Sequence, residues 1–259
     1  MKAKVIMIAS GKGGTGKSTV SVLLGGCLGA RKKKVLLIEL DSGLRSVDII
    51  SGVYGKTIYD IQDVLCGRCE GGKAVVESPV YPGLSVISAP YEGGEVRPER
   101  LKKMVEAMRP YFDYILLDTA AGLGAPFQAA AGVSSMALLV ITPDPVTLRD
   151  GGIVCQHLRD AGIAEIRLVI NRLNLLTFRK GPIRDLDECI DTVGAQLIAV
   201  MPESMLLQKA AAAGEPLPAG EAFLQTAQNL AGRVMGEQIP LAIRLWPRTA
   251  PAGCSVTLL

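Results

Sequence analysis

The stretch that decides the fold is AKVIMIASGKGGTGKSTVSVLLGGCL, residues 3–28. It opens with a short apolar run, passes through a loop rich in glycine and lysine, and continues into a longer segment of small and apolar residues. A buried strand followed by a helix has this pattern, and glycines are typical of the turn between them. The stretch therefore predicts a strand, a loop and a helix at the start of an α/β fold.

Further apolar runs of strand length follow, separated by longer segments of helical period. They are KVLLIEL (34–40), LSVISA (84–89), DYILLD (113–118), MALLVIT (136–142), IRLVIN (166–171) and AQLIAVMP (195–202). Runs that are apolar on both faces and alternate with helices are typical of buried parallel strands. The sequence therefore predicts an α/β fold with a doubly wound, mostly parallel sheet flanked by helices.

Two of the intervening segments have clear helical ends. PERLKKMVEAMRP (98–110) and VTLRDGGIVCQHLRDAG (146–162) space apolar positions three and four apart and stop at proline or glycine. We interpret residues 1–238 as one domain, with a loop at 211–220 before a last helix in EAFLQTAQNLAGRVMGEQ. Residues 239–259 contain three prolines and no sustained period, which predicts an irregular tail.

Composition and charge argue against several classes of protein. Of the 259 residues, 49% are apolar, which is ample for a buried core, while the net charge of +3 is too small to indicate wholesale nucleic-acid binding. The basic run RKKK (31–34) falls where a first helix should end, so we interpret it as a helix cap and not as a DNA-binding patch. No apolar run approaches the roughly 18 residues of a membrane span, and the N-terminal run is too short for a signal peptide.

The six cysteines are scattered along the chain. Cys27, Cys155 and Cys189 fall in helical segments, as expected for small buried side chains in a reducing compartment. Cys66 and Cys69 form the one close pair, but no second pair or neighbouring histidine completes a metal-ligand set within the chain. We interpret the pair as structural, and a ligand pair that bridges two subunits is the alternative.

Residues 11–18, GKGGTGKS, match the pattern G-x-x-x-x-G-K-[ST]. Its glycines let the backbone wrap closely around oxyanions, so that N–H groups and the helix N-terminus face phosphates. They are Gly11, Gly13, Gly14 and Gly16. Lys17 adds a positive charge at the β- and γ-phosphates, and the Ser18 hydroxyl is a ligand for Mg²⁺. The motif therefore predicts a site for nucleotide phosphates and Mg²⁺.

Hydrolysis needs carboxylates for Mg²⁺ and for the attacking water, placed at the carboxyl ends of neighbouring strands. VLLIELD ends in Asp41, and YILLDTAAG delivers Asp118, followed by small residues that suit a mobile segment near a γ-phosphate. An aspartate at a strand end can alternatively cap the next helix. The residues alone leave both interpretations open.

The motif KGGTGKST resembles the deviant Walker A motif of the MinD/ParA family of P-loop ATPases. DSGLRSVD, DTAAG, TPDPVTLRD and VINRLN resemble later motifs of the MinD branch in the same order, so the likeness runs from about residue 2 to about residue 238. The resemblance implies a Mg²⁺-dependent ATP hydrolase that binds ATP and ADP, forms a homodimer when ATP is bound, and is activated by dimerisation. It also implies an activating protein partner.

The resemblance gives each catalytic residue a role. Lys12 matches a lysine that reaches across the dimer interface to the nucleotide of the other subunit, where a desolvated cation stabilises developing charge. Without the family, Lys12 could be a solvated loop lysine. Asp41 matches the aspartate that positions the attacking water, and Asp118 the aspartate behind Mg²⁺. The implied catalytic set is Lys12, Lys17, Asp41 and Asp118, with Ser18, Asp41 and Asp118 at the metal, the two aspartates through water.

Further positions match the base pocket of the family. Asn171 and Arg172 fall on the pair that surrounds adenine, and an Asn amide suits the adenine edge because it both donates and accepts. Pro202 matches another position of the pocket, and Asp150 an acidic residue close to the interface and the signature lysine. The implied nucleotide-binding set is Gly11, Gly13, Gly14, Thr15, Gly16, Lys17, Ser18, Thr19, Asn171, Arg172 and Pro202.

Three departures from the family pattern affect the expectations. Ser46 stands where the MinD branch commonly has Asn, and Ala120 stands where proline is usual, which loosens that segment. The tail offers no basic amphipathic helix of the kind that docks MinD proteins on lipid, and residues 239–246, IPLAIRLW, make a very short apolar anchor at most. We therefore expect a cytoplasmic protein, with peripheral attachment at the inner face of the cell membrane as an open alternative.

The leading interpretation is a MinD-like switch in the spatial organisation of the bacterial cell, most commonly division-site placement. Alternatives are a relative that positions flagella or pili and a ParA-type DNA-partitioning ATPase, which the small net charge argues against. A nitrogenase iron-protein-like ATPase needs a cluster between subunits, and the CGRC pair lies outside the strand ends that such a cluster requires. Enzymes like dethiobiotin synthetase lack the lysine seen here as Lys12.

Overall fold

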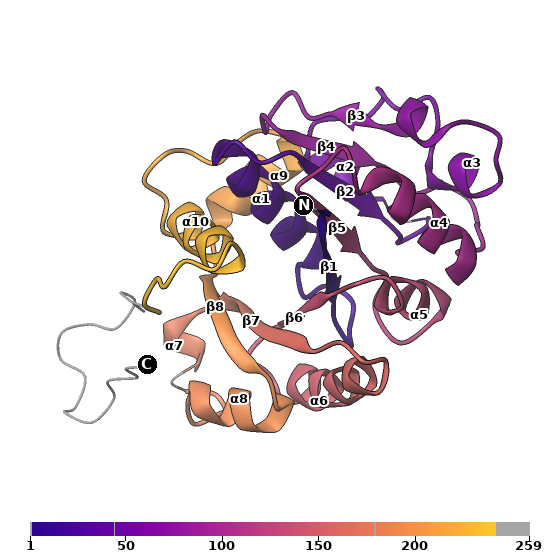
Figure 1. Cartoon of the computed structure of the whole chain (residues 1–259). Coiled ribbons are helices and arrows are strands. Elements are labelled where there is room, and N and C mark those ends of the chain that lie inside the picture. Colours follow the sequence, from indigo (N-terminus) through magenta and orange to yellow (C-terminus); the bar gives the residue numbers. More distant parts are fainter. Residues whose placement is uncertain (1, 44, 179, 242–259) are drawn as a thin grey trace.

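The computed structural model describes residues 2–43, 45–178 and 180–241. Eight strands form one sheet in the order β3-β4-β2-β5-β1-β6-β7-β8 (Figure 1). They are β1 (Lys4–Ala9), β2 (Val35–Glu39), β3 (Val76–Glu77), β4 (Leu84–Ile87), β5 (Tyr114–Asp118), β6 (Met136–Ile141), β7 (Glu165–Leu173) and β8 (Gln196–Pro202). All neighbours pair in parallel except β3 with β4, which confirms the predicted doubly wound, mostly parallel sheet.

Helices cover both faces of this sheet (Figure 1). One face packs against α1 (Lys17–Ala30), α2 (Val47–Ile50), α9 (Met205–Ala213) and α10 (Ala222–Val234). The other packs against α3 (Ile61–Leu65), α4 (Pro98–Met108), α5 (Ala125–Ala131), α6 (Pro145–Asp160), α7 (Leu175–Phe178) and α8 (Leu186–Val193). A 3-10 turn, η1 (Gly71–Ala74), precedes β3. Three layers with a central sheet therefore bury every parallel strand.

The two-sided burial explains why the central positions of the strands are mostly apolar. In β1, Met7 packs in the core cluster on one face and Ile8 in the cluster on the other, because successive side chains of a strand point to opposite faces. Each apolar run that the sequence analysis identified becomes a strand of this sheet. β3 was not predicted, because its two residues at the sheet edge are too short and too exposed for a pattern.

The predicted loop at 211–220 is wrong in its first three residues. α9 continues to Ala213, because alanine has the highest helix propensity and nothing in AAAA breaks the helix. It ends where Gly214 adopts a φ of 63°, the left-handed conformation typical of a helix C-terminus. The last predicted helix is observed as α10, which ends at Val234, four residues before the predicted end at 238.

Several smaller expectations fall within the described residues. α1 ends at Ala30 with Arg31 as its cap, and Arg31 Nη1 pairs with Glu237 Oε1 at 2.7 Å beside α10, so the basic run begins as a helix cap, as predicted. Cys27, Cys155 and Cys189 are buried in helices, also as predicted. Residues 239–241 have no regular structure, and the rest of the predicted tail lies outside the described residues. In the described part of the chain, no helix is long and apolar enough to cross a membrane.

Candidate functional site

The sheet brings the predicted site residues to one edge. β1, β2 and β5 are parallel neighbours, so the loop after Ala9, the segment after Glu39 and Asp118 at the end of β5 all lie at their carboxyl ends. In register, Asp118 faces Ile8 on one side and Glu39 on the other. Ligands of doubly wound folds bind at this edge of the sheet.

The glycine loop between β1 and α1 is shaped by close packing. Gly16 has a φ of 89°, and a Cβ there would collide with the side-chain nitrogen of Asn171. A Cβ at Gly11 would lie 2.7 Å from the Cβ of Asp150. Glycine is therefore required at these two positions because α6 and β7 approach the loop, and the residue after Gly16 can begin α1 with its N-terminus facing the site.

A buried cluster of polar side chains lies under the loop. Asp118 is fully buried and accepts hydrogen bonds from Ser18 Oγ at 2.7 Å and from Ser21 Oγ at 2.8 Å. Burial raises the pKa of Asp118 to about 6, although both hydroxyls and the nearby Lys17 charge act in the opposite direction. A buried carboxylate next to a serine hydroxyl is a donor set that suits Mg²⁺.

Lys17 lies in the same cluster and is 7% exposed. Burial lowers its pKa, and the negative charges of Asp118 and Asp41 oppose that shift. Asp41, partly buried, is therefore close enough to influence Lys17 electrostatically. The structure thus brings together three of the four predicted catalytic residues: Lys17, Asp41 and Asp118.

The fourth, Lys12, is exposed. Within the described ranges, no carboxylate lies at ion-pair distance from its ammonium group. Asp150, the predicted acidic neighbour, packs against Gly11 and pairs instead with Arg149 at 2.8 Å. Its charge is near enough to Asp144 to lower the pKa of that carboxyl, but the exposed ammonium group remains accessible to a group outside the subunit.

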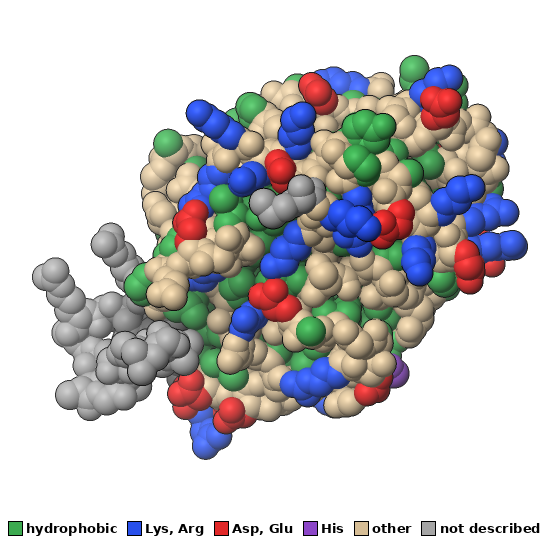
Figure 2. All heavy atoms as spheres, in the orientation of Figure 1, with side chains coloured by type: hydrophobic (Ala, Val, Ile, Leu, Met, Phe, Trp, Pro, Cys, Tyr) green, Lys and Arg blue, Asp and Glu red, His purple; other side chains and the backbone are tan. Residues whose placement is uncertain are grey.

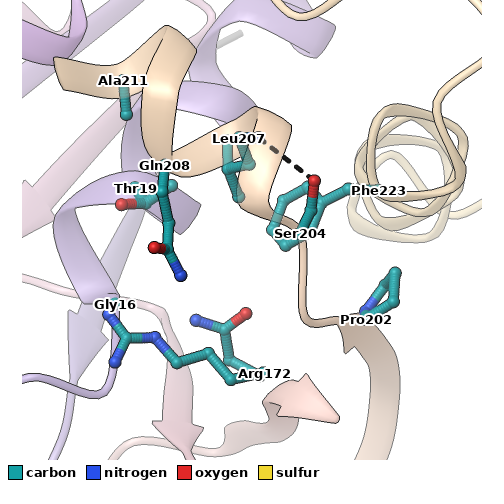
Figure 3. Close-up of a pocket in the computed structure, with 10 residues that line it drawn as sticks. Gly16, Thr19, Arg172, Pro202, Ser204, Leu207, Gln208, Ala211 and Phe223 are labelled. Carbon is teal, nitrogen blue, oxygen red and sulfur yellow. Dashed lines mark hydrogen bonds between the residues drawn. The ribbon is translucent and has the colours of Figure 1, made fainter. Parts of the chain in front are cut away.

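The predicted base-pocket residues line a common cavity (Figure 3). Gly16, Thr19, Asn171, Arg172 and Pro202 form its walls together with side chains from α9, α10 and the segment before α9. The added lining residues are Ser204, Leu207, Gln208, Ala211 and Phe223. Figure 3 shows the Gln208 side chain extending from α9 into the cavity and the Arg172 side chain extending toward Gly16. The contribution of α9 to the cavity was not predicted, because the sequence pattern did not indicate that helix.

Asn171 connects this cavity to the glycine loop. Its side chain is buried, and Nδ2 donates a hydrogen bond to the Thr15 carbonyl at 2.7 Å. The amide orientation is fixed, because only the nitrogen can face a carbonyl oxygen at that distance. Its Oδ1 and the buried hydroxyl of Thr15 have no hydrogen-bond partner among the described residues. Buried polar atoms rarely stay unpaired, so both are candidates to bind a ligand.

Glu39 is a further polar residue of the site that the sequence analysis did not single out. It is 1% exposed at the end of β2, next to Asp118 in the sheet. Burial raises its pKa to about 7, against the effect of hydrogen bonds from the Ser46, Val47 and Ala89 amides. The signal in the sequence was an acidic residue inside the apolar run VLLIEL, since charged side chains are rarely buried without partners.

A glycine loop between a central strand and a helix, with a buried lysine, serine and aspartate, defines the class of P-loop nucleotide-binding proteins. The model of the CobQ/CobB/MinD/ParA nucleotide binding domain matches residues 6–217 of this chain. The chain therefore belongs to this family. The nucleotide-binding role expected from the resemblance is confirmed at the level of the family.

Individual relatives are similar over most of their length. The septum site-determining protein MinD of Bacillus subtilis is 32% identical over 247 residues, which cover 93% of this chain and 92% of the relative. MinD in the MinC:MinD cell division protein complex of Aquifex aeolicus superposes with a TM-score of 0.86 at 34% identity, over 92% of this chain and 98% of that one. MinD of Pyrococcus horikoshii, solved with Mg-ADP, superposes with a TM-score of 0.80 at 26% identity, over 90% and 96% of the two chains.

Proposed function

We propose that this chain is a Mg²⁺-dependent ATPase that acts as an ATP-dependent dimerisation switch of the MinD kind in division-site placement. The observation that carries the proposal is the cluster of buried Lys17 and Asp118 with the half-buried Ser18 beneath a glycine loop. The septum-site names of relatives similar over nine-tenths of the chain support the cellular role.

The residues present fit a nucleotide and Mg²⁺. The Ser18 hydroxyl and Asp118, with Asp41 nearby, would hold the metal, which when bound neutralises charge on the phosphates. Lys17 places a further cation at the same point. The loop backbone from Gly11 to Gly16 offers N–H donors to the phosphate oxygens. On this proposal, the residues of one chain are sufficient to bind the phosphates.

The fixed amide of Asn171 favours adenine over guanine. The hydrogen bond from Nδ2 to the Thr15 carbonyl fixes the orientation of the amide, so that the unpaired Oδ1 presents a hydrogen-bond acceptor to the base. Adenine presents an amino donor where guanine presents a carbonyl acceptor, so guanine would set two oxygen lone pairs against each other. The cavity holds only about 40 Å³, so the exposed side chains of Arg172 and Gln208 must move aside when a base enters.

Hydrolysis on this proposal needs two subunits. Asp41 orients the attacking water, and the exposed Lys12 of one subunit stabilises charge on the nucleotide of the other. ATP therefore stabilises the dimer, and hydrolysis dissolves it. We also expect a protein partner that binds the ATP-bound dimer. The Aquifex relative was solved with MinC, which supports a protein partner.

A DNA-partitioning function is the second candidate. Figure 2 shows Asp and Glu side chains interspersed among Lys and Arg on the face in view, and the net charge is +3. DNA binding depends on a concentrated field of positive charge. The mixed surface supports a protein partner over DNA.

Sedimentation velocity of an Asp41→Ala variant tests the switch. We expect a dimer with Mg-ATP and a monomer with Mg-ADP, because the variant holds ATP without hydrolysing it. A monomer in both states would contradict the proposal. If the Asp41→Ala variant hydrolyses ATP as fast as the parent, Asp41 does not orient the attacking water.

Sedimentation of the same variant with anionic liposomes tests the proposed localisation, which is the cytoplasm and the inner face of the cell membrane. Pelleting with Mg-ATP but not with Mg-ADP would support surface patterning of the division type. A dimer that stays in the supernatant with both nucleotides would contradict a membrane role and assign the switch to a soluble partner.

A further inference from the structure

The carboxylate of Glu39 connects two loops at the edge of the site. Its Oε1 accepts hydrogen bonds from the backbone N–H groups of Ser46, at 2.9 Å, and Val47, at 3.1 Å. Its Oε2 accepts one from the backbone N–H of Ala89, at 3.3 Å. Ser46 ends the segment that follows β2, residues 40–46, which we call the Asp41 loop. Ala89 belongs to residues 88–91 after β4, which we call the Ala89 loop.

Further contacts join the same two loops. The Gly43 amide donates to the Pro90 carbonyl at 3.2 Å, and the Arg45 guanidinium lies 4.0 Å from the centre of the Tyr91 ring. Arg45 also pairs with Asp48 of α2 at 2.9 Å, and both side chains are nearly fully buried. Gly43 and Arg45 of the Asp41 loop therefore contact the Ala89 loop, and Glu39 is hydrogen-bonded to both loops.

Glu39 is well suited to fix these loops because it is itself immobile. β2 lies inside the sheet, hydrogen-bonded to β4 on one side and to β5 on the other. A buried carboxylate is costly unless several donors satisfy it, and backbone N–H groups are its partners here. An apolar side chain, like its neighbours in β2, would avoid that cost but could accept no hydrogen bond from either loop.

We propose that Glu39 is a positioning residue, whose carboxylate holds the Asp41 loop against the Ala89 loop and so fixes Asp41 beside the phosphate site. Asp41 lies two residues after Glu39, and the same loop returns to Glu39 at Ser46. One end of the loop thus continues directly from β2, and the other end is hydrogen-bonded to the last side chain of that strand. The consequence for hydrolysis rests on the proposed function, whereas the effect on the loops does not.

Hydrogen exchange of the full-length, nucleotide-free protein tests the positioning directly. In Glu39→Leu, we expect the amides of Ser46, Val47 and Ala89 to exchange about tenfold faster or more, since a hydrogen bond to a charged group is strong. Glu39→Gln keeps one acceptor oxygen, so only one of the two loops should be released. Ser88→Ala is the matched control, because Ser88 lies in the Ala89 loop and its buried hydroxyl has no hydrogen-bond partner among the described residues.

A merely structural role would give a different pattern. General destabilisation would speed exchange equally in the core strands β1 and β5. Unchanged exchange at all three amides in Glu39→Leu would overturn the proposal. If Glu39→Leu does not fold, Glu39→Gln decides the question. Faster exchange in one loop, with the core strands still protected, supports the proposal. Parental protection of both loops in Glu39→Gln refutes it.

Kinetics then separate positioning from binding. We expect both Glu39 variants to bind ADP within about threefold of the parent, because Lys17 and the glycine loop are untouched, while kcat for ATP falls about tenfold or more. A parental kcat with released loops would overturn the link to Asp41. If the parent protein itself hydrolyses no ATP, the proposed function fails, while the exchange result still decides whether Glu39 holds the loops.

Discussion

At the scale of single residues, the two lysines of the glycine loop differ in their surroundings. Lys17 is buried between carboxylates, whereas Lys12 is exposed and without an ion pair among the described residues. One loop therefore contains a cation directed inward at its own site and a cation directed outward. We therefore expect Lys17 to be needed for nucleotide binding, and Lys12 to be needed for hydrolysis but not for ADP binding.

Replacement of Lys17 by Ala should abolish nucleotide binding, since the phosphates lose the cation at the centre of the site. Fluorescent ADP titration measures this, with Lys56→Ala as a control at an exposed lysine away from the loop. Binding within threefold of the parent would show that Lys17 does not contact phosphate.

Replacement of Lys12 by Ala should leave ADP affinity within about threefold of the parent and reduce ATP hydrolysis by about a thousandfold, the effect of a cation supplied in trans. Steady-state phosphate release at saturating ATP checks it. Parental turnover in this variant would refute a role for Lys12 in the transition state.

Two buried carboxyl groups make stability depend on pH. Burial raises the folded-state pKa of Glu39 from 4.5 to about 7 and that of Asp118 from 3.8 to about 6. At these two sites the folded protein binds protons that the unfolded chain releases, so their contribution to the free energy of unfolding should be largest below about pH 4 and fall until about pH 7. For Glu39 the loss is roughly 3 kcal/mol.

Urea unfolding of the nucleotide-free protein at pH 5 and pH 7.5 measures this effect. Glu39→Gln cannot ionise, so its free energy of unfolding should fall less over the same interval. Equal falls in variant and parent would show that Glu39 does not titrate in this window.

At the scale of elements, the glycine loop depends on β7 as much as on its own sequence. Gly16 cannot accept a side chain, because its φ is 89° and Asn171 of β7 lies against it. Asn171 in turn donates to the Thr15 carbonyl. The base pocket and the phosphate loop are thus joined by one buried amide.

Gly16→Ala should therefore lower the free energy of unfolding of the nucleotide-free protein by about 1–2 kcal/mol, from left-handed backbone strain and the collision with Asn171. Gly13 has no neighbour within 4 Å of an added Cβ and no positive φ, so Gly13→Ala is the control, with a change within about 0.5 kcal/mol. Equal losses in urea unfolding would contradict the packing argument.

The elements also show what a sequence can predict. Strands such as β1 and β6 were recognisable because burial on both faces leaves an uninterrupted apolar run. Asn171 and Pro202 were placed through motif resemblance, and the structure puts both in one cavity. α9 was missed because its Ala-rich end precedes a loop of Gly and Pro, and Glu39 because its partners are backbone groups of distant loops, which no local pattern reveals.

At the scale of the whole molecule, the proposed catalytic site needs a residue from a second chain. Lys17, Asp41 and Asp118 converge at the sheet edge, but the remaining predicted catalytic group, Lys12, is exposed beside them. The proposed ATPase therefore has composite sites, each with Asp41 from one subunit and Lys12 from the other. Closed two-fold symmetry would build two such sites at once.

The most direct test of this claim mixes two inactive variants, Lys12→Ala and Asp41→Ala, and measures ATP hydrolysis. A mixed dimer has one complete site, in the subunit that keeps Asp41 and receives Lys12 from its partner. With random pairing, about a quarter of the parental activity should return. If the mixture stays as inactive as each variant alone, Lys12 acts within its own subunit or not at all, and the account of a dimerisation-dependent ATPase is wrong.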